Sequence, residues 1–255
     1  FYNWGMSLGI LGLQNGKIVS SSTDKLVMDI PSLTTIISPN NVGNVNNMGY
    51  QNSYVMGLMG RKSNATTELV FPIGSTNVYG PLSLTPQGTT TQTYSCDYTS
   101  NGYGTYTLDP TNSPQLDHVS LVEYWNVAST ASGSNDDAKV KLFWRTHSIV
   151  GPSASEWSQL RVAHFDGTDW NTEGNSPAFH ATPSTAWGWV ESDTYVPNFS
   201  PMTLGTLTSL NPLPVELTSF TGSCLGDGIA QINWTTASEL NSKYFILQRS
   251  EDGSH

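Results

Sequence analysis

Two glutamates stand beside aromatic residues in this 255-residue chain, an arrangement that suits acid–base chemistry on a sugar. Glu123 precedes a Tyr-Trp pair, and Glu191 lies two residues after Trp189. A glycosidase needs two such carboxyl groups, one protonated and one ionised. Side chains alternate along a strand, so each glutamate can instead point to solvent while its aromatic neighbours face inward. We favour that second interpretation and predict no catalytic residues.

Other patterns that carry chemistry are missing from the sequence. None of the five histidines shows His-x-x-x-His spacing or a cysteine neighbour, so zinc is not expected. No Gly-x-Ser-x-Gly elbow, phosphate-binding loop or dinucleotide fingerprint occurs. The sequence therefore predicts a protein that is not an enzyme and that needs no organic cofactor.

Two short acidic loops offer closely spaced oxygen ligands. Asp136 and Asp137 follow Asn135, and Asp166 is separated from Asp169 by Gly-Thr. Calcium prefers such ligands, although neither loop has the full pattern of a helix–loop–helix calcium site. Tight turns use the same residue types. Calcium at these aspartates is thus a weak candidate, with simple β-turns as the alternative.

A Trp-Gly-Trp sequence places Trp187 and Trp189 two residues apart. On a strand these side chains share a face. An exposed pair would make a flat platform on which sugar rings stack, whereas a pair on the inner face would belong to the core. The sequence favours the core and keeps the glycan platform as the alternative.

The two cysteines, Cys96 and Cys224, lie far apart in the chain. An even count permits one disulfide in an oxidising compartment. Such a bond would join the C-terminal part of the chain to its main body. Two separate thiols are the other possibility, and the sequence leaves both open.

Composition excludes several classes of partner. Charged residues make up 12% of the chain, and 20 acidic against 10 basic side chains give a formal charge of −10. About 25% charged is usual for soluble domains. Nucleic acids and anionic membranes require a basic surface, so neither is expected as a partner. No apolar run reaches the roughly 18 residues of a membrane span. An acidic, Lys-poor surface is typical of exported proteins, which predicts an extracellular or outer cell-surface location.

Short alternating segments separated by Gly, Asn, Pro and Ser predict an all-β fold, a β-sandwich. Residues 138–144 alternate most clearly, with two lysines on one face and aliphatic residues on the other. The Thr- and Tyr-rich residues 89–106 predict a half-exposed strand pair that turns at Asn101-Gly102. The run Arg61-Lys62-Ser63-Asn64 predicts a polar hairpin connection.

Three regions follow from these patterns. Residues 1–50 contain short strands that are either rungs of a β-solenoid or the first strands of the body, and residues 51–211 form the sandwich body. Pro212 and Pro214 mark a hinge, because proline cannot donate a ladder hydrogen bond. Residues 212–255 then contain the first strands of an incomplete immunoglobulin-like module. Its expected strands are residues 215–220, 229–236 and 243–249.

The hinge and the segments after it carry a resemblance. The sequence Pro-Leu-Pro-Val-Glu-Leu-Thr-Ser-Phe ends at Phe220, Trp-Thr-Thr-Ala-Ser-Glu-Leu-Asn begins at Trp234, and Arg-Ser-Glu-Asp-Gly ends at Gly253. This order resembles the C-terminal regions of large surface proteins that Bacteroidota export by the type IX secretion system. The resemblance covers roughly residues 50–255. It implies an immunoglobulin- or fibronectin-III-like module and secretion to the cell surface, and it implies no particular activity.

Together these features predict a non-enzymatic extracellular protein with a structural or adhesive role, as one part of a longer polypeptide. A sandwich that lacks strands exposes unpaired edges, which another copy can complete. Assembly into a filament or sheath as a homo-oligomer is therefore one form of that role, and other cell-surface proteins or glycans are further candidate partners. The alternative is a carbohydrate-binding module of a larger secreted enzyme.

Overall fold

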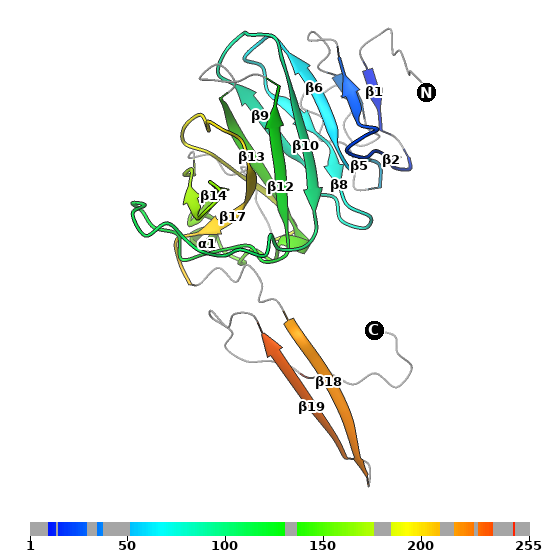
Figure 1. Ribbon diagram of the computed structural model, residues 1–255, viewed down its shortest axis with the longest axis vertical. Helices are drawn as coiled ribbons and strands as arrows, with labels where there is room; N and C mark the ends of the chain where they lie inside the picture. Colours follow the sequence, from blue (N-terminus) through cyan, green and yellow to red (C-terminus); the bar gives the residue numbers. More distant parts are fainter. Residues whose placement is uncertain are drawn as a thin grey trace. The chain divides into compact units, whose positions relative to one another are not determined.

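The computed structural model divides the chain into two compact units, Phe1–Pro214 and Val215–His255 (Figure 1). The boundary falls within the proline hinge. Each unit is described by itself below. The residues that the structure describes are 10–13, 15–29, 35–37, 52–130, 137–175, 185–209, 217–226, 229–236 and 247.

The first unit is a β-sandwich, which confirms the predicted all-β fold class. Its larger sheet has the strand order β15-β14-β17-β12-β10-β6-β3, and β11 also pairs with β17. The smaller sheet has the order β16-β13-β9-β7. The strands of the larger sheet are β3 (Leu26–Met28), β6 (Met59–Ser63), β10 (Gln92–Thr99), β11 (His118–Val119), β12 (Tyr124–Ser129), β14 (Leu160–Phe165), β15 (Trp170–Thr172) and β17 (Pro201–Thr206). Those of the smaller sheet are β7 (Leu69–Phe71), β9 (Leu82–Pro86), β13 (Ala138–Arg145) and β16 (Trp187–Glu191).

The main core lies between these two sheets. Val140, Leu142 and Trp144 point into it from β13, and each is fully buried. The intervening residues of β13 face outward, as the alternating sequence predicts. Trp144 stacks on Trp157 of the short helix α1 (Ala154–Trp157), with ring centroids 6.3 Å apart. A single-turn 3₁₀ helix, η1 (Thr146–Ser148), follows β13.

Residues of the N-terminal region pair in parallel. Strand β1 (Ile10–Gly12) pairs with β4 (Thr35–Ile37), and β2 (Ile18–Val19) pairs with β5 (Val55–Met56), which pairs in turn with β8 (Ile73–Gly74). Parallel pairing is the arrangement of solenoid rungs. Strand β3, however, joins β6 in the larger sheet of the sandwich. The N-terminal strands therefore combine features of both predicted alternatives.

The predicted strand pair at Asn101-Gly102 is wrong. Strand β10 pairs with β12 and β6 instead, and the residues after it form no strand until β11 apart from an isolated bridge at Leu108. Tyr103 and Tyr106 pack with Phe165 and Trp170 in a second apolar cluster. The free energy gained by burying the two tyrosine rings against β14 and β15 outweighs the preference of Asn101-Gly102 for a hairpin turn.

The predicted polar connection at residues 61–64 is also wrong. Arg61 lies inside β6 with 2% of its surface exposed, and its guanidinium donates a 2.7 Å hydrogen bond to the carbonyl of Val70. Burial lowers the pKa of Arg61 to about 10. The chain turns only after Ser63, where β6 ends.

The described part of the second unit is a long antiparallel hairpin made of β18 (Leu217–Gly226) and β19 (Ile229–Thr236). From the Ser219–Thr235 pair to the Cys224–Ala230 pair, the apolar residues share one face and the polar residues share the other. The apolar face carries Phe220, Cys224, Ala230, Ile232 and Trp234; the polar face carries Ser219, Thr221, Ser223, Gln231, Asn233 and Thr235. The predicted third strand, residues 243–249, lies outside the described residues except for Leu247. Among the helices described, none is long and apolar enough to span a bilayer.

Candidate functional site

The outer face of the smaller sheet carries an aromatic and cationic ladder that joins β13 to β16. Trp187 lies opposite Arg145 in the strand register, and Trp189 lies opposite Phe143. Phe143 and Trp187 stack with their centroids 5.7 Å apart and their planes inclined by 20°. The guanidinium carbon of Arg145 lies 3.8 Å from the centre of the Trp187 ring. We call these residues, together with Lys141, the outer ladder.

The two tryptophans share a face, as predicted from their spacing. That face is the outer one: both rings are half-buried, and neither belongs to the core between the sheets. The favoured prediction of a core pair is therefore wrong. The reason is the register, which places the adjacent Gly188 and Val190 opposite Trp144 and Leu142 on the inner face.

An ion-pair triad forms the polar end of the outer ladder. The ammonium of Lys141 lies 2.7 Å from a carboxylate oxygen of Glu68 and 3.5 Å from one of Glu191. The hydroxyl of Ser83 donates a 2.5 Å hydrogen bond to Glu68. The Lys141 ammonium also lies 4.7 Å from the centre of the Trp189 ring. Indole, cation and carboxylates therefore meet at one place on the sheet.

Arg145 connects the outer ladder to a buried carboxyl group. Its guanidinium also lies 5.1 Å from the centre of the Tyr79 ring, and burial lowers the pKa of Arg145 to about 10. Glu123 is 2% exposed, and its Oε2 accepts a 2.8 Å hydrogen bond from Tyr98. Burial raises the pKa of Glu123, while the charge of Arg145 acts in the opposite direction.

The two glutamates that could have served a glycosidase have separate partners. Glu123 precedes β12 of the larger sheet and is buried, which contradicts the expectation that it points to solvent. Glu191 lies on β16 of the smaller sheet, where it contacts Lys141. Each carboxyl group thus has its own partners, and the geometry gives no support to two carboxyl groups acting on one sugar bond.

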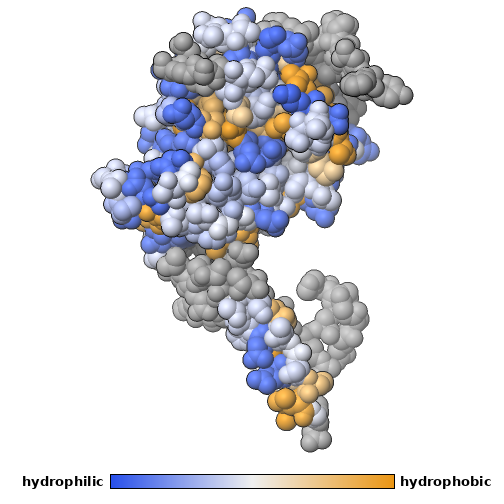
Figure 2. All heavy atoms as spheres, in the orientation of Figure 1, coloured by the Kyte–Doolittle hydropathy of each residue, from blue (hydrophilic) through white to orange (hydrophobic). Residues whose placement is uncertain are grey.

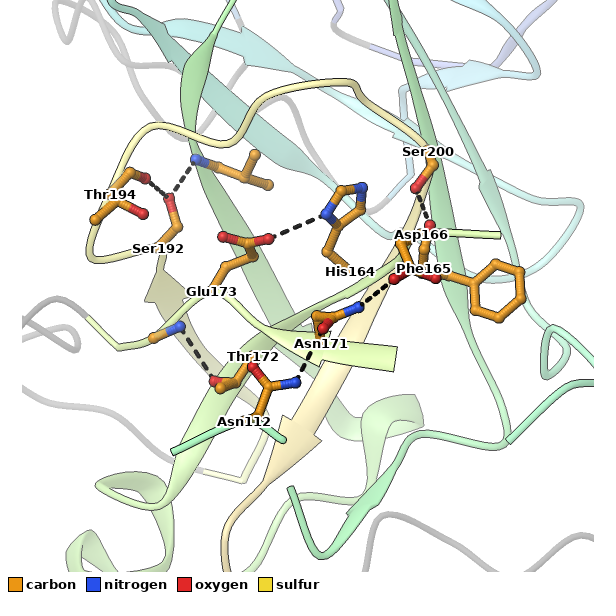
Figure 3. A network of polar contacts seen from close by, with 12 residues as sticks. Asn112, His164, Phe165, Asp166, Asn171, Thr172, Glu173, Ser192, Thr194 and Ser200 are labelled. Carbon is orange, nitrogen blue, oxygen red and sulfur yellow. Dashed lines mark hydrogen bonds and ion pairs between the residues drawn. The ribbon is translucent and has the colours of Figure 1, made fainter. Parts of the chain in front are cut away.

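The Asp166 loop is a tight turn, closed by a 3.1 Å hydrogen bond from the Asp166 N–H to the Asp169 carbonyl; Figure 3 shows the contact between Asp166 and Asn171. One oxygen of Asp166 accepts hydrogen bonds from the backbone N–H groups of Thr168 at 2.8 Å and Asp169 at 3.0 Å, and the other accepts one from Asn171 at 3.0 Å. These donors hold the pKa of Asp166 below its usual range. Both carboxylate oxygens of Asp166 thus already accept hydrogen bonds from the loop itself. This arrangement favours the β-turn interpretation over a calcium site.

The second acidic loop is described only in part. Asp136 lies outside the described residues, and the carbonyl of Asp137 accepts a 2.9 Å hydrogen bond from the backbone of Gln87. Within the described ranges, no three His, Cys, Asp or Glu side chains lie close enough together to hold a metal ion.

A histidine–glutamate pair lies near the Asp166 turn and was not predicted from the sequence. His164 Nδ1 is 3.0 Å from an oxygen of Glu173, and both side chains are largely buried (Figure 3). Alternation along β14 predicts which face His164 occupies. Glu173 comes from the chain after β15, and only the tertiary structure brings it there.

The two cysteines have different surroundings. Cys96 is fully buried in β10, and Cys224 is exposed on β18; both are free thiols in this structure. Burial raises the pKa of Cys96 well above its ordinary value. A disulfide between the two units stays a prediction that requires Cys96 to become accessible.

Comparison with known proteins adds no assignment. No protein family matches the chain, and neither a curated protein nor a solved structure shows significant similarity to it.

Proposed function

We propose that this chain is a non-enzymatic extracellular protein with a structural or adhesive role at the cell surface. The resemblance around the hinge supports export by the type IX secretion system. The observation that carries the proposal is the apolar face of the β18–β19 hairpin. Phe220 is 56% exposed and Trp234 is 41% exposed, and they lie opposite each other in the register.

Such a face offers an apolar surface to a further element. Two-stranded hairpins gain stability in water when such a face packs against one. Burying one phenylalanine completely stabilises a protein by about 1.5–3 kcal/mol. Figure 2 shows further apolar side chains at the end of the hairpin, where Leu225 and Ile229 are 62% and 60% exposed. We propose that the face packs against another copy of the chain, which makes the protein a subunit of an assembly.

The test measures assembly directly. Wild-type protein and the double variant F220S/W234S are compared by light scattering and negative-stain microscopy over a wide concentration range. Thr221 and Asn233 form the neighbouring pair on the polar face, so T221S/N233S is the matched control. We expect oligomers or filaments from wild type and the control and single particles from F220S/W234S. Single particles from wild type at every concentration would refute self-assembly.

A second candidate function is supported by a different observation. The outer ladder presents Trp187 and Trp189 on the outer face of the sandwich, beside charged groups that can form hydrogen bonds. Aromatic rings next to polar groups suit carbohydrate binding, as in a binding module of a larger secreted enzyme. Retention on polysaccharide columns would support this function, and absence of retention on every polysaccharide would exclude it.

A further inference from the structure

We propose that the outer ladder contains one compact sugar-binding site, at Trp189 and the Lys141–Glu68–Glu191 triad, and that its ligand is a neutral polysaccharide. This inference rests on the second candidate function, carbohydrate binding. It goes further by dividing the ladder into a ligand-binding end and a structural end.

The Trp187 end is structural. Phe143 stacks on the Trp187 ring, and the Arg145 guanidinium lies 3.8 Å from its centre. Arg145 is in turn attracted by buried Glu123 and lies near the Tyr79 ring. These contacts occupy the Trp187 ring and hold it in place, so it anchors the sheet face.

The Trp189 end has fewer described ring contacts than the Trp187 end. Within the described part of the chain, no aromatic ring stacks on Trp189, and its one cationic contact is the Lys141 ammonium 4.7 Å from the ring centre. We propose that a pyranose binds against the exposed part of this half-buried indole. An aromatic face binds the C–H face of a sugar ring through apolar contact.

The triad supplies the polar half of the site. Lys141 has three donor hydrogens, and the carboxylates of Glu68 and Glu191 can each accept several hydrogen bonds. The side chains of all three are largely buried, with 16% of Lys141 and 19% of each glutamate exposed, and a sugar would meet these exposed atoms. Donors and acceptors side by side match neighbouring sugar hydroxyl groups, which both donate and accept.

Charge selects a neutral ligand. The carboxylates of Glu68 and Glu191 are balanced by Lys141 and by Lys139, which shares the outward face of β13, so this end of the ladder has no net formal charge. The whole chain has a formal charge of −10. Uronate and sulfate groups are therefore repelled. A protein partner also fits poorly, because none of the large apolar side chains most exposed in the described residues lies on β13 or β16.

The test uses the full chain and affinity electrophoresis in gels containing hydroxyethyl cellulose, laminarin, mannan, alginate or chitosan. We expect retardation by at least one neutral polymer and none by alginate. W189A should weaken that binding about tenfold or more, as removal of an aromatic anchor does. W187F tests the division of the ladder and should bind like wild type if the Trp187 end is structural. Y195F, at an aromatic residue that is 36% exposed and lies outside the ladder, is the matched control.

Three outcomes overturn the inference in distinguishable ways. No retardation by any polymer would remove carbohydrate binding together with the site. Binding that survives in W189A but is lost in W187F would keep carbohydrate binding and refute this division of the ladder. Binding to alginate or chitosan in preference to the neutral polymers would refute the ligand class. Circular dichroism of each variant checks that the sandwich is folded.

Discussion

Gly188 is the position where a small change should disturb the sandwich most directly. It lies between the two tryptophans of the outer ladder and opposite Trp144 in the β13–β16 register. A Cβ atom at Gly188 would lie 1.9 Å from Cζ2 and 2.3 Å from Cε2 of Trp144. Trp144 is fully buried and stacks on Trp157, so its ring can move only by disturbing its core contacts.

The expected cost of G188A follows from this overlap. Overpacking a well-packed core costs about 1–3 kcal/mol. We expect the upper end, because a buried indole is rigid and the overlap is with ring atoms. A loss of about 3 kcal/mol lowers the midpoint of thermal unfolding by roughly 6–12 °C in a domain of this size.

The assay is thermal and urea unfolding followed by circular dichroism. G12A is the matched control, because a Cβ at Gly12 meets no atom within 4 Å and its stability should be close to that of wild type. If G188A unfolds at the same temperature as wild type and G12A, then Trp144 does not cover Gly188. The packing argument for the inner face of β16 would then be refuted.

Three further predictions concern titratable groups. A thiol reagent should label Cys224 in the folded protein and Cys96 only after denaturation, because burial raises the pKa of Cys96; failure to label either thiol even in denaturant without reductant would indicate the disulfide. Burial raises the pKa of Glu123, so its contribution to the free energy of unfolding is lost as pH rises from the ordinary glutamate range through the raised value. The stability difference between wild type and E123Q, measured by urea unfolding, should change across that range, and a constant difference would contradict this. Calcium should leave the unfolding temperature unchanged, because Asp166 already accepts three N–H donors; a calcium-dependent rise that D166N abolishes would restore the calcium site.

The alternation of residue types was sufficient to predict the fold class and some shared faces. It placed Trp187 and Trp189 together, and it separated the lysines of β13 from its aliphatic residues. It could not decide which face of β16 would be buried, because that depends on the register with β13. A one-residue shift in register exchanges the inner and outer faces.

The burial of charged residues could not be predicted from the sequence, for a related reason. Arg61 and Glu123 look like surface residues in their local context, and both are buried. Their burial depends on groups far away in the sequence, such as the Val70 carbonyl for Arg61 and the Tyr98 hydroxyl for Glu123. The triad on Lys141 is similar, because Glu191 comes from β16 next to β13, whereas Glu68 precedes β7 on the far side of β9.

The place of β17 in the larger sheet has a consequence for the time at which the sandwich can form. Strand β17 is the last strand in the described part of the first unit, and it is hydrogen-bonded to β14, β12 and β11. A chain that leaves the ribosome or a transport channel with its N-terminus first cannot join β12 to β14 until Thr206 has emerged. Closing such distant pairings is slow. Passage through a narrow channel in an extended form is therefore compatible with this fold, because the topology delays completion of the sheet until nearly the whole unit has emerged.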